Sequence, residues 1–141
     1  MEADNGFHPP PTDDKWWQES SLFTWGDPRR GFGGEVRVGM HPNQGVANLY
    51  TWIVWGGRLI YRRHFVDQPI LKEVLNAKIA SASVKTIEPL MHYEVTLKDE
   101  NFALKLNWRN FHWPMAMGYN VGGATVTTGH YNMMGACSGV F

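Results

Sequence analysis

Cysteine is nearly absent from this sequence, because Cys137 is the only one among 141 residues. A single thiol excludes an internal disulfide and argues against an oxidising compartment. Long apolar runs are also missing, and none approaches the roughly 20 residues that a transmembrane helix needs. The acidic, proline-rich first 14 residues lack the apolar stretch of a secretory signal. We therefore predict a cytoplasmic protein with no membrane partner.

The sequence also lacks an excess of charge of either sign. It has 13 basic and 13 acidic residues, which gives a formal net charge of zero. No basic block exceeds two consecutive residues, as at Arg29-Arg30 and Arg62-Arg63. Nucleic acids and anionic membranes attract clustered basic side chains, so the sequence predicts neither as a partner.

Aromatic residues, in contrast, are plentiful, with 7 Trp, 7 Phe and 5 Tyr. Apolar and polar residues alternate from position 16 to position 55, and glycine-rich turns interrupt the pattern. Alternation with a period of two is typical of strands that bury one face. Strands are predicted at residues 16–25, 35–40, 47–55, 58–66, 79–87, 92–98, 102–108, 125–128 and 130–141. The stretch 67–78 breaks this rhythm and is predicted as a long loop or one or two helical turns.

The predicted fold class is all-β: an antiparallel meander of about eight strands that closes into a small barrel. Residues 1–14 are expected to form a flexible lead, because three consecutive prolines at 9–11 cannot join a sheet ladder. Residues 15–141 then form a single barrel domain. The chain still reads as strand where it stops, so an open barrel edge that pairs with a second copy is a possible route to a homo-oligomer.

A small barrel can hold an apolar molecule in its mouth, and we expect aromatic rings and a few polar groups to line it. The candidate ligand-binding residues are Trp17, Phe23, Trp25, Asn48, Tyr50, Trp52, Tyr61, Arg62 and Trp108. The alternative is a core that these rings fill by themselves, and composition does not separate the two.

Two candidate catalytic residues follow from this pattern. Glu19 shares an otherwise apolar face with Trp17 and Phe23, where burial would raise the pKa of its carboxyl and let it move a proton. His64 is the second candidate, and both side chains could line one interior together with Asn48, Tyr50 and Arg62. A structural ion pair of Glu19 with Arg37 or Arg62 is the alternative.

No motif predicts a metal or an organic cofactor. His92 and Glu94 share a strand face, but a metal site needs three or four converging ligands. Cys137 sits in a G-x-C-x-G spelling, yet the helix that a nucleophile elbow requires cannot follow so close to residue 141. Cys137 is therefore expected to be a small buried core residue.

Several short stretches together resemble the lipocalin-like (calycin) proteins grouped with hydroxyneurosporene synthase, a carotenoid hydratase. The stretches are Trp17-Gln18-Glu19-Ser20, Arg37-Val38-Gly39, Pro42-Asn43-Gln44-Gly45-Val46-Ala47-Asn48, Tyr50, Trp52, Tyr61-Arg62, Gly129-His130-Tyr131, Gly135 and Ser138-Gly139. The resemblance implies a β-barrel lobe and an apolar ligand of isoprenoid or polyketide type. It also implies a two-lobed protein of which this chain is the N-terminal lobe, and it transfers no catalytic residue.

Three functions are compatible with these observations. The first is a barrel that binds an apolar molecule and promotes a cofactor-free isomerisation, hydration or cyclisation. The second is a carrier with the same cavity and no turnover. The third is a structural or interaction domain whose core is filled by its own side chains.

Overall fold

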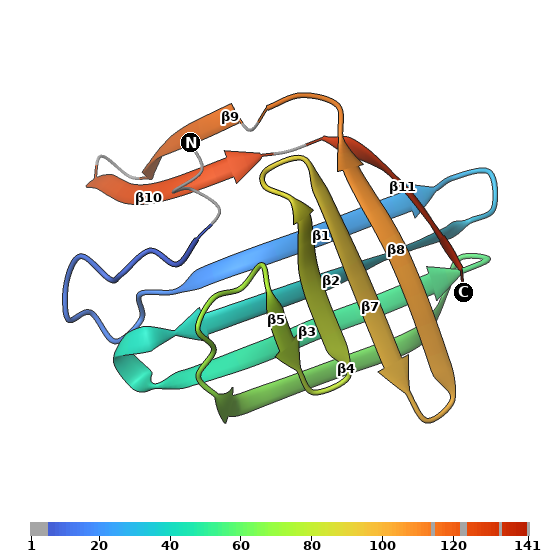
Figure 1. Cartoon of the computed structure of the whole chain (residues 1–141), viewed down its shortest axis with the longest axis horizontal. Helices are drawn as coiled ribbons and strands as arrows, with labels where there is room; N and C mark the ends of the chain where they lie inside the picture. The colour runs from blue at the N-terminus through green and yellow to red at the C-terminus, as the bar shows by residue number, and fades with distance from the viewer. Residues whose placement is uncertain (1–5, 114, 122–123, 133, 141) are drawn as a thin grey trace.

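The computed structural model describes residues 6–140 except 114, 122–123 and 133, and for 115–132 it describes the backbone alone. These residues form eleven strands and one short 3-10 turn at Pro42–Gln44, with no α-helix among them (Figure 1). The predicted all-β class is confirmed. The loop predicted for residues 67–78 is irregular only from 70 to 76, because the strands on either side reach further than expected.

The first sheet contains four antiparallel strands in chain order. They are β1 (Glu19–Asp27), β2 (Phe32–His41), β3 (Val46–Trp55) and β4 (Arg58–Pro69). Gly56 and Gly57 form the two-residue turn between β3 and β4, with φ angles of 55° and 76°. A two-residue turn with positive φ at both positions matches the twist of a hairpin, and it strongly favours glycine.

The second sheet has the order β11-β8-β7-β6-β5, and β9 and β10 pair only with each other. The strands are β5 (Ala77–Ile79), β6 (Ala82–Glu88), β7 (His92–Asp99), β8 (Phe102–Asn110), β9 (Met115–Val121), β10 (Ala124–Asn132) and β11 (Gly135–Val140). The hairpin predicted at 92–108 is confirmed. The single strand predicted at 79–87 is divided into β5 and β6 by a turn in which Ala80 has a φ of 45°.

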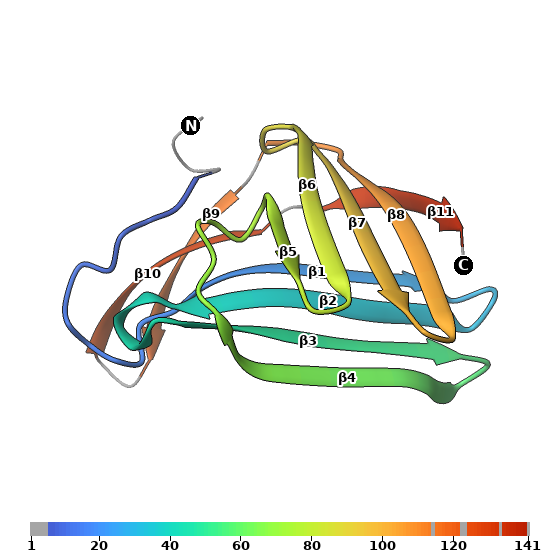
Figure 2. The ribbon, with the colours of Figure 1, turned by 60° about the horizontal axis from the view of Figure 1, so that its bottom comes forward.

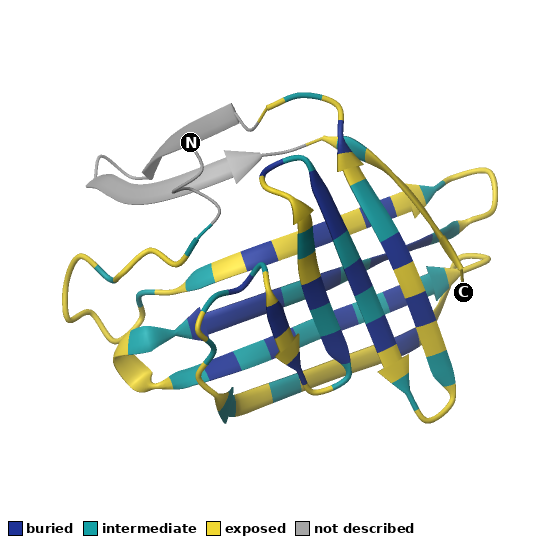
Figure 3. Ribbon diagram, in the orientation of Figure 1, coloured by how far each residue is buried: buried dark blue, intermediate teal, exposed yellow. Residues whose placement is uncertain are grey.

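The two sheets form two layers whose strands cross at a steep angle (Figures 1 and 2). Along β7 and β8 buried residues alternate with intermediate or exposed ones, so one face of each strand is covered (Figure 3). The covered faces supply one continuous hydrophobic core between the layers. Its fully buried members include Val36, Val38, Met40, Leu49, Ile53, Tyr93 and Val95.

The predicted closed barrel of about eight strands is not confirmed. Among the described strands no ladder joins β4 to β5 or β1 to β11, so the two sheets remain separate. A barrel closes only when its first and last strands pair. Here β1 and β4 each have a ladder partner on one side only, and the fold is a two-layer arrangement with open edges.

The segment before β1 is held against the first sheet by hydrogen bonds. Asn43, in the short 3-10 turn, donates from Nδ2 to the carbonyl oxygens of Thr12 and Asp14, at 2.8 and 2.9 Å. The backbone N–H of His8 points at both carboxylate oxygens of Glu19, at 3.2 and 3.3 Å. The described part of the lead is therefore irregular in backbone but attached at both ends.

Candidate functional site

The register of the first sheet divides the predicted site residues between its two faces. Glu19, Phe23 and Trp25 lie opposite Met40, Val36 and Gly34, on the face that packs on the second sheet. Asn48, Tyr50 and Trp52 lie on the other face of β3, because their neighbours Leu49, Thr51 and Ile53 are the buried ones. His64 and Arg62 pair with Tyr50 and Trp52, so they share this outer face. The single interior expected for Glu19, Asn48, Tyr50, Arg62 and His64 is therefore not formed.

The inward-facing rings contact one another across the layers. The centroid of Phe23 lies 5.6 Å from that of Tyr93 and 5.7 Å from that of Trp108, both in edge-to-face geometry. Trp25 is 8% exposed and its ring lies against Gly34. Trp17, half-buried, precedes β1 and belongs to the irregular lead. Phe23, Trp25 and Trp108 thus act as packing between the sheets.

Glu19 stands at the start of β1, where the lead covers it. Its Oε1 lies 2.6 Å from Nδ1 of His8, and the pair is an ion pair when the imidazole is protonated. The alternative partners weighed for Glu19, Arg37 and Arg62, are engaged elsewhere: Arg37 donates to Gln18 at 3.0 Å, and the Arg62 guanidinium lies 5.9 Å from the Tyr50 ring centre. Glu19 is therefore a structural anchor for the lead in this arrangement.

The outward side chains of β1–β4 form what we call the aromatic face. The register places Leu22, Thr24, Glu35, Arg37, Asn48, Tyr50, Trp52, Arg62 and His64 on it, and the exposed Ile60 and Val66 lie beside them at irregularities of β4. Tyr50 and His64 meet edge to face with centroids 5.6 Å apart. Exposed aliphatic side chains flank these rings, among them Leu22 at 53% and Val66 at 52%.

A hollow of about 340 Å³ opens where the edge of β4 meets the β7–β8 turn. We call it the edge hollow. Its lining residues are Leu59, Ile60, Tyr61, Arg62, Arg63, Asp99, Glu100, Asn101 and Phe102. Two of them, Tyr61 and Arg62, were predicted from the sequence as ligand-binding residues. The hollow lies at the open side of the two layers and not between their inner faces.

One wall of the edge hollow is formed by Tyr61, Arg63 and Asp99, which join the two sheets and which we call the latch. The carboxylate of Asp99 accepts hydrogen bonds from the Tyr61 hydroxyl and from Nε of Arg63, both at 3.1 Å. The ring of Tyr61 stacks on Phe102 with centroids 4.5 Å apart and an interplanar angle of 18°. The Arg63 guanidinium lies 5.0 Å from the centre of the same Tyr61 ring. These contacts tie β4 to the β7–β8 turn.

The ionisation of the latch is fixed by its own contacts. The backbone N–H of Glu100, 2.7 Å from Oδ1, lowers the pKa of Asp99, and Tyr61 and Arg63 lower it further. Burial raises the pKa of Tyr61, and the neighbouring Asp99 carboxylate adds to this rise. At neutral pH the latch therefore pairs a charged carboxylate with an intact phenol and a guanidinium.

Sequence reasoning missed the residues that complete the edge hollow, namely Asp99, Glu100, Asn101 and Phe102. The first three fall between the strands predicted at 92–98 and 102–108. The hydrogen-bond partners of Asp99, Tyr61 and Arg63, lie 38 and 36 positions earlier in the chain. A periodic pattern within one strand does not encode a contact between two crossed sheets.

Among the residues that the structure describes, no three His, Cys, Asp or Glu side chains gather as metal ligands. Cys137 is exposed on β11, so the prediction of a buried core cysteine is wrong. Across the same residues, no helix is both long and apolar enough to cross a bilayer.

Comparison with known proteins gives a family but no characterised relative. No curated protein matches this chain, and no solved structure does. One family model, described as a domain of unknown function, matches residues 1–141. Because that match covers the whole sequence, the chain belongs to the DUF7064 family.

Proposed function

We propose that this domain binds an amphipathic small molecule in the edge hollow and does so without turnover. The observation that carries the proposal is the hollow itself, because its volume of about 340 Å³ falls within the usual range for small-molecule sites, roughly 300–1,000 Å³. The proposal keeps the apolar ligand expected from the sequence. It moves the site from a barrel interior to the junction of β4 with the β7–β8 turn.

The lining of the edge hollow has a larger polar part and a smaller apolar part, which together suit an amphipathic molecule. Leu59 and Ile60 present apolar side chains that are 57% and 47% exposed, and Phe102 adds an aromatic edge. Arg62 and Asn101 supply hydrogen-bond donors at the same site. An isoprenoid or polyketide-like chain that ends in a carboxylate or hydroxyl group has this combination.

The latch supports binding better than catalysis. Asp99 is already paired, and its lowered pKa keeps it ionised at neutral pH, so it has no proton to donate. Glu19 and His64 lie on opposite faces of the first sheet and cannot act on one bound molecule. The carrier alternative is therefore favoured over a hydratase-like or cyclase-like enzyme.

A titration followed by amide resonances tests the site. Farnesoic acid, a C15 isoprenoid carboxylate, is the probe, and farnesol is its head-group control. We expect shifts confined to residues 59–63 and 99–102, with weaker binding of farnesol. Leu59→Ser should weaken binding roughly tenfold, because losing one apolar contact of this size costs about 1.4 kcal/mol.

A matched variant checks that the effect is local. Leu22→Ser removes an equally exposed leucine from the outer side of β1 and should leave the affinity unchanged. Shifts centred on the core around Tyr93 and Leu97, or no shifts at millimolar probe, would overturn the edge hollow as the site. The lipocalin-like relationship and the cytoplasmic location stay predictions.

A further inference from the structure

The aromatic face is built from two neighbouring rows of side chains that run across the four strands. The Tyr50 row consists of Leu22, Arg37, Tyr50 and His64. The Trp52 row consists of Thr24, Glu35, Trp52 and Arg62. Each row takes one residue from each strand, and the two rows are two positions apart along every strand.

The composition of this face is that of an interface centre. Tyr, Trp and Arg are the residues enriched at the centres of protein–protein interfaces, where they carry most of the binding energy. Tyr50 and Trp52 are half-buried in the middle of the sheet, and exposed aliphatic side chains such as Leu22 and Ile60 surround them. The aromatic face shares Ile60 and Arg62 with the edge hollow, but binding through this face does not require a ligand in the hollow.

We propose that the aromatic face binds the same face of a second copy of this chain. A two-fold axis that runs across the strands, midway between the two rows, places each row on the other row of the partner. Arg37 then meets the partner's Glu35, and Glu35 meets the partner's Arg37. Tyr50 meets the partner's Trp52 in the same reciprocal way. The register alone produces this self-complementarity.

The groups that would cross the interface retain bonding capacity. Arg37 uses one of its five N–H donors on Gln18, at 3.0 Å. Glu35 accepts one bond from the Thr24 hydroxyl, at 3.3 Å, and its carboxylate can accept several more. The outer ends of the rows add little, since Leu22 meets the partner's Thr24, and His64 meets the partner's Arg62.

The area of the aromatic face indicates how tightly the two copies should bind. Four strands about 4.8 Å apart and ten residues long cover roughly 19 Å by 33 Å. This is at the lower end of specific interfaces, which bury about 800 Å² per partner. We therefore expect a dimer that dissociates on dilution in the micromolar range.

Sedimentation equilibrium over a concentration series tests the proposal through charge exchange. Glu35→Arg alone sets arginine against arginine in both contacts between positions 35 and 37, and Arg37→Glu alone sets glutamate against glutamate in both. Each variant should be monomeric at concentrations where the unmodified chain is dimeric. An equimolar mixture of the two variants should form a heterodimer, because every contact between positions 35 and 37 is again between opposite charges.

Two further variants complete the experiment. Trp52→Ser should also give a monomer, whereas Lys85→Glu, on the outer face of the second sheet, should leave the dimer unchanged. Circular dichroism and thermal unfolding show that each variant is folded. An unmodified chain that stays monomeric at about 1 mM, single variants that remain dimeric, or a mixture that stays monomeric would each overturn the proposal.

Discussion

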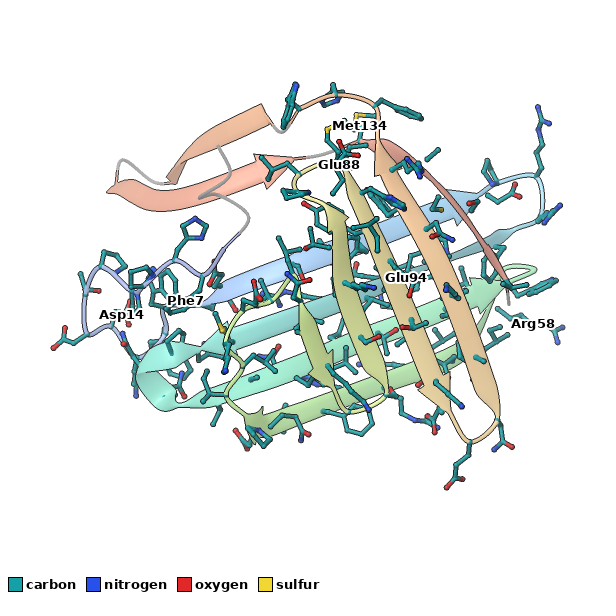
Figure 4. The ribbon with its side chains drawn as sticks, viewed as in Figure 1. Phe7, Asp14, Arg58, Glu88, Glu94 and Met134 are labelled. Atoms are coloured by element: carbon teal, nitrogen blue, oxygen red, sulfur yellow. The ribbon has the colours of Figure 1, made fainter. Side chains whose placement is uncertain are left out.

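The side chains on the outer faces of the two sheets differ in kind, whereas the inner faces of both sheets are apolar. On the second sheet, Lys85 lies beside Glu94, and Glu94 also pairs with Lys105 at 2.7 Å. Figure 4 shows Glu94 on β7. The hydroxyl groups of Ser83 and Thr96 are hydrogen-bonded to each other on the same face. The corresponding face of the first sheet carries a tyrosine and a tryptophan at its centre.

Both sheets contribute inward-facing side chains to one core, and that core does not require their outer faces to differ. A face made of lysine, glutamate, serine and threonine satisfies its polar groups in water and offers little apolar area to a partner. The aromatic face leaves apolar area open, and exposed patches of this kind mark binding surfaces. In the proposed dimer, the first sheet is the contact side of the domain and the second sheet is the solvent side.

The largest expected loss of stability comes from a substitution in the core that both sheets share. Phe23→Ala removes a ring that is 3% exposed and contacts Tyr93 and Trp108 of the second sheet. The expected loss is about 3–5 kcal/mol of unfolding free energy, since a large cavity is left between the layers. Urea unfolding followed by tryptophan fluorescence measures it.

Hydrogen exchange on the same variant sharpens the comparison. Amides of both sheets should lose protection together, because one continuous core supports them. Leu22→Ala, one position away but outward-facing, should change stability by less than about 0.5 kcal/mol. If only the amides of the first sheet lost protection, the two sheets would unfold as separate cooperative units.

An intermediate effect is expected from the latch that fixes the crossing of the sheets. The pKa of Asp99 is lower in the folded chain than in the unfolded chain, where it is near 3.9. The charged carboxylate therefore adds its full share to the free energy of unfolding above about pH 3.9. That share is lost as the pH falls through the lower pKa of the folded chain. Thermal unfolding of the unmodified chain and of Asp99→Asn should therefore differ most at neutral pH. The difference should shrink below about pH 4, and one that stayed constant down to pH 2 would contradict the charged latch.

The smallest effect is expected on the charged face. Glu94→Gln breaks the pair with Lys105, whose side chain is half-exposed, and should cost less than about 1 kcal/mol. Raising the salt concentration from about 0.1 M to about 1 M should remove most of that loss. A larger loss of unfolding free energy, or a loss that salt does not change, would mean that the Glu94–Lys105 pair stabilises the fold more than an exposed ion pair does. Unfolding in urea at the two salt concentrations measures it.

Alternation in the sequence predicted the strands and hairpins better than it predicted their orientation. The Gly56-Gly57 turn and the hairpin of β7 and β8 are local, so composition alone located them. β3 is apolar on both faces, and its sequence does not say which face turns inward. The choice is made by β2, whose buried Val36 and Val38 stand in register with Thr51 and Leu49.

The edge hollow and the open edges depend on distances along the chain that periodicity does not reach. Tyr61 on β4 and Asp99 at the end of β7 are hydrogen-bonded because the crossing of the two sheets brings these positions together. Closure of a barrel likewise depends on whether the outermost strands find one another. Sequence patterning within each strand is compatible with either outcome, so neither the hollow nor the open arrangement was predictable from it.

The exposed thiol on β11 has a practical consequence. Because Cys137 is the only cysteine, a maleimide fluorophore or nitroxide would attach at one defined position without any substitution. That position belongs to the second sheet, so the attached group is not on the aromatic face of the first sheet. Spectroscopic distances between two labelled copies would then report how the molecules are oriented in solution.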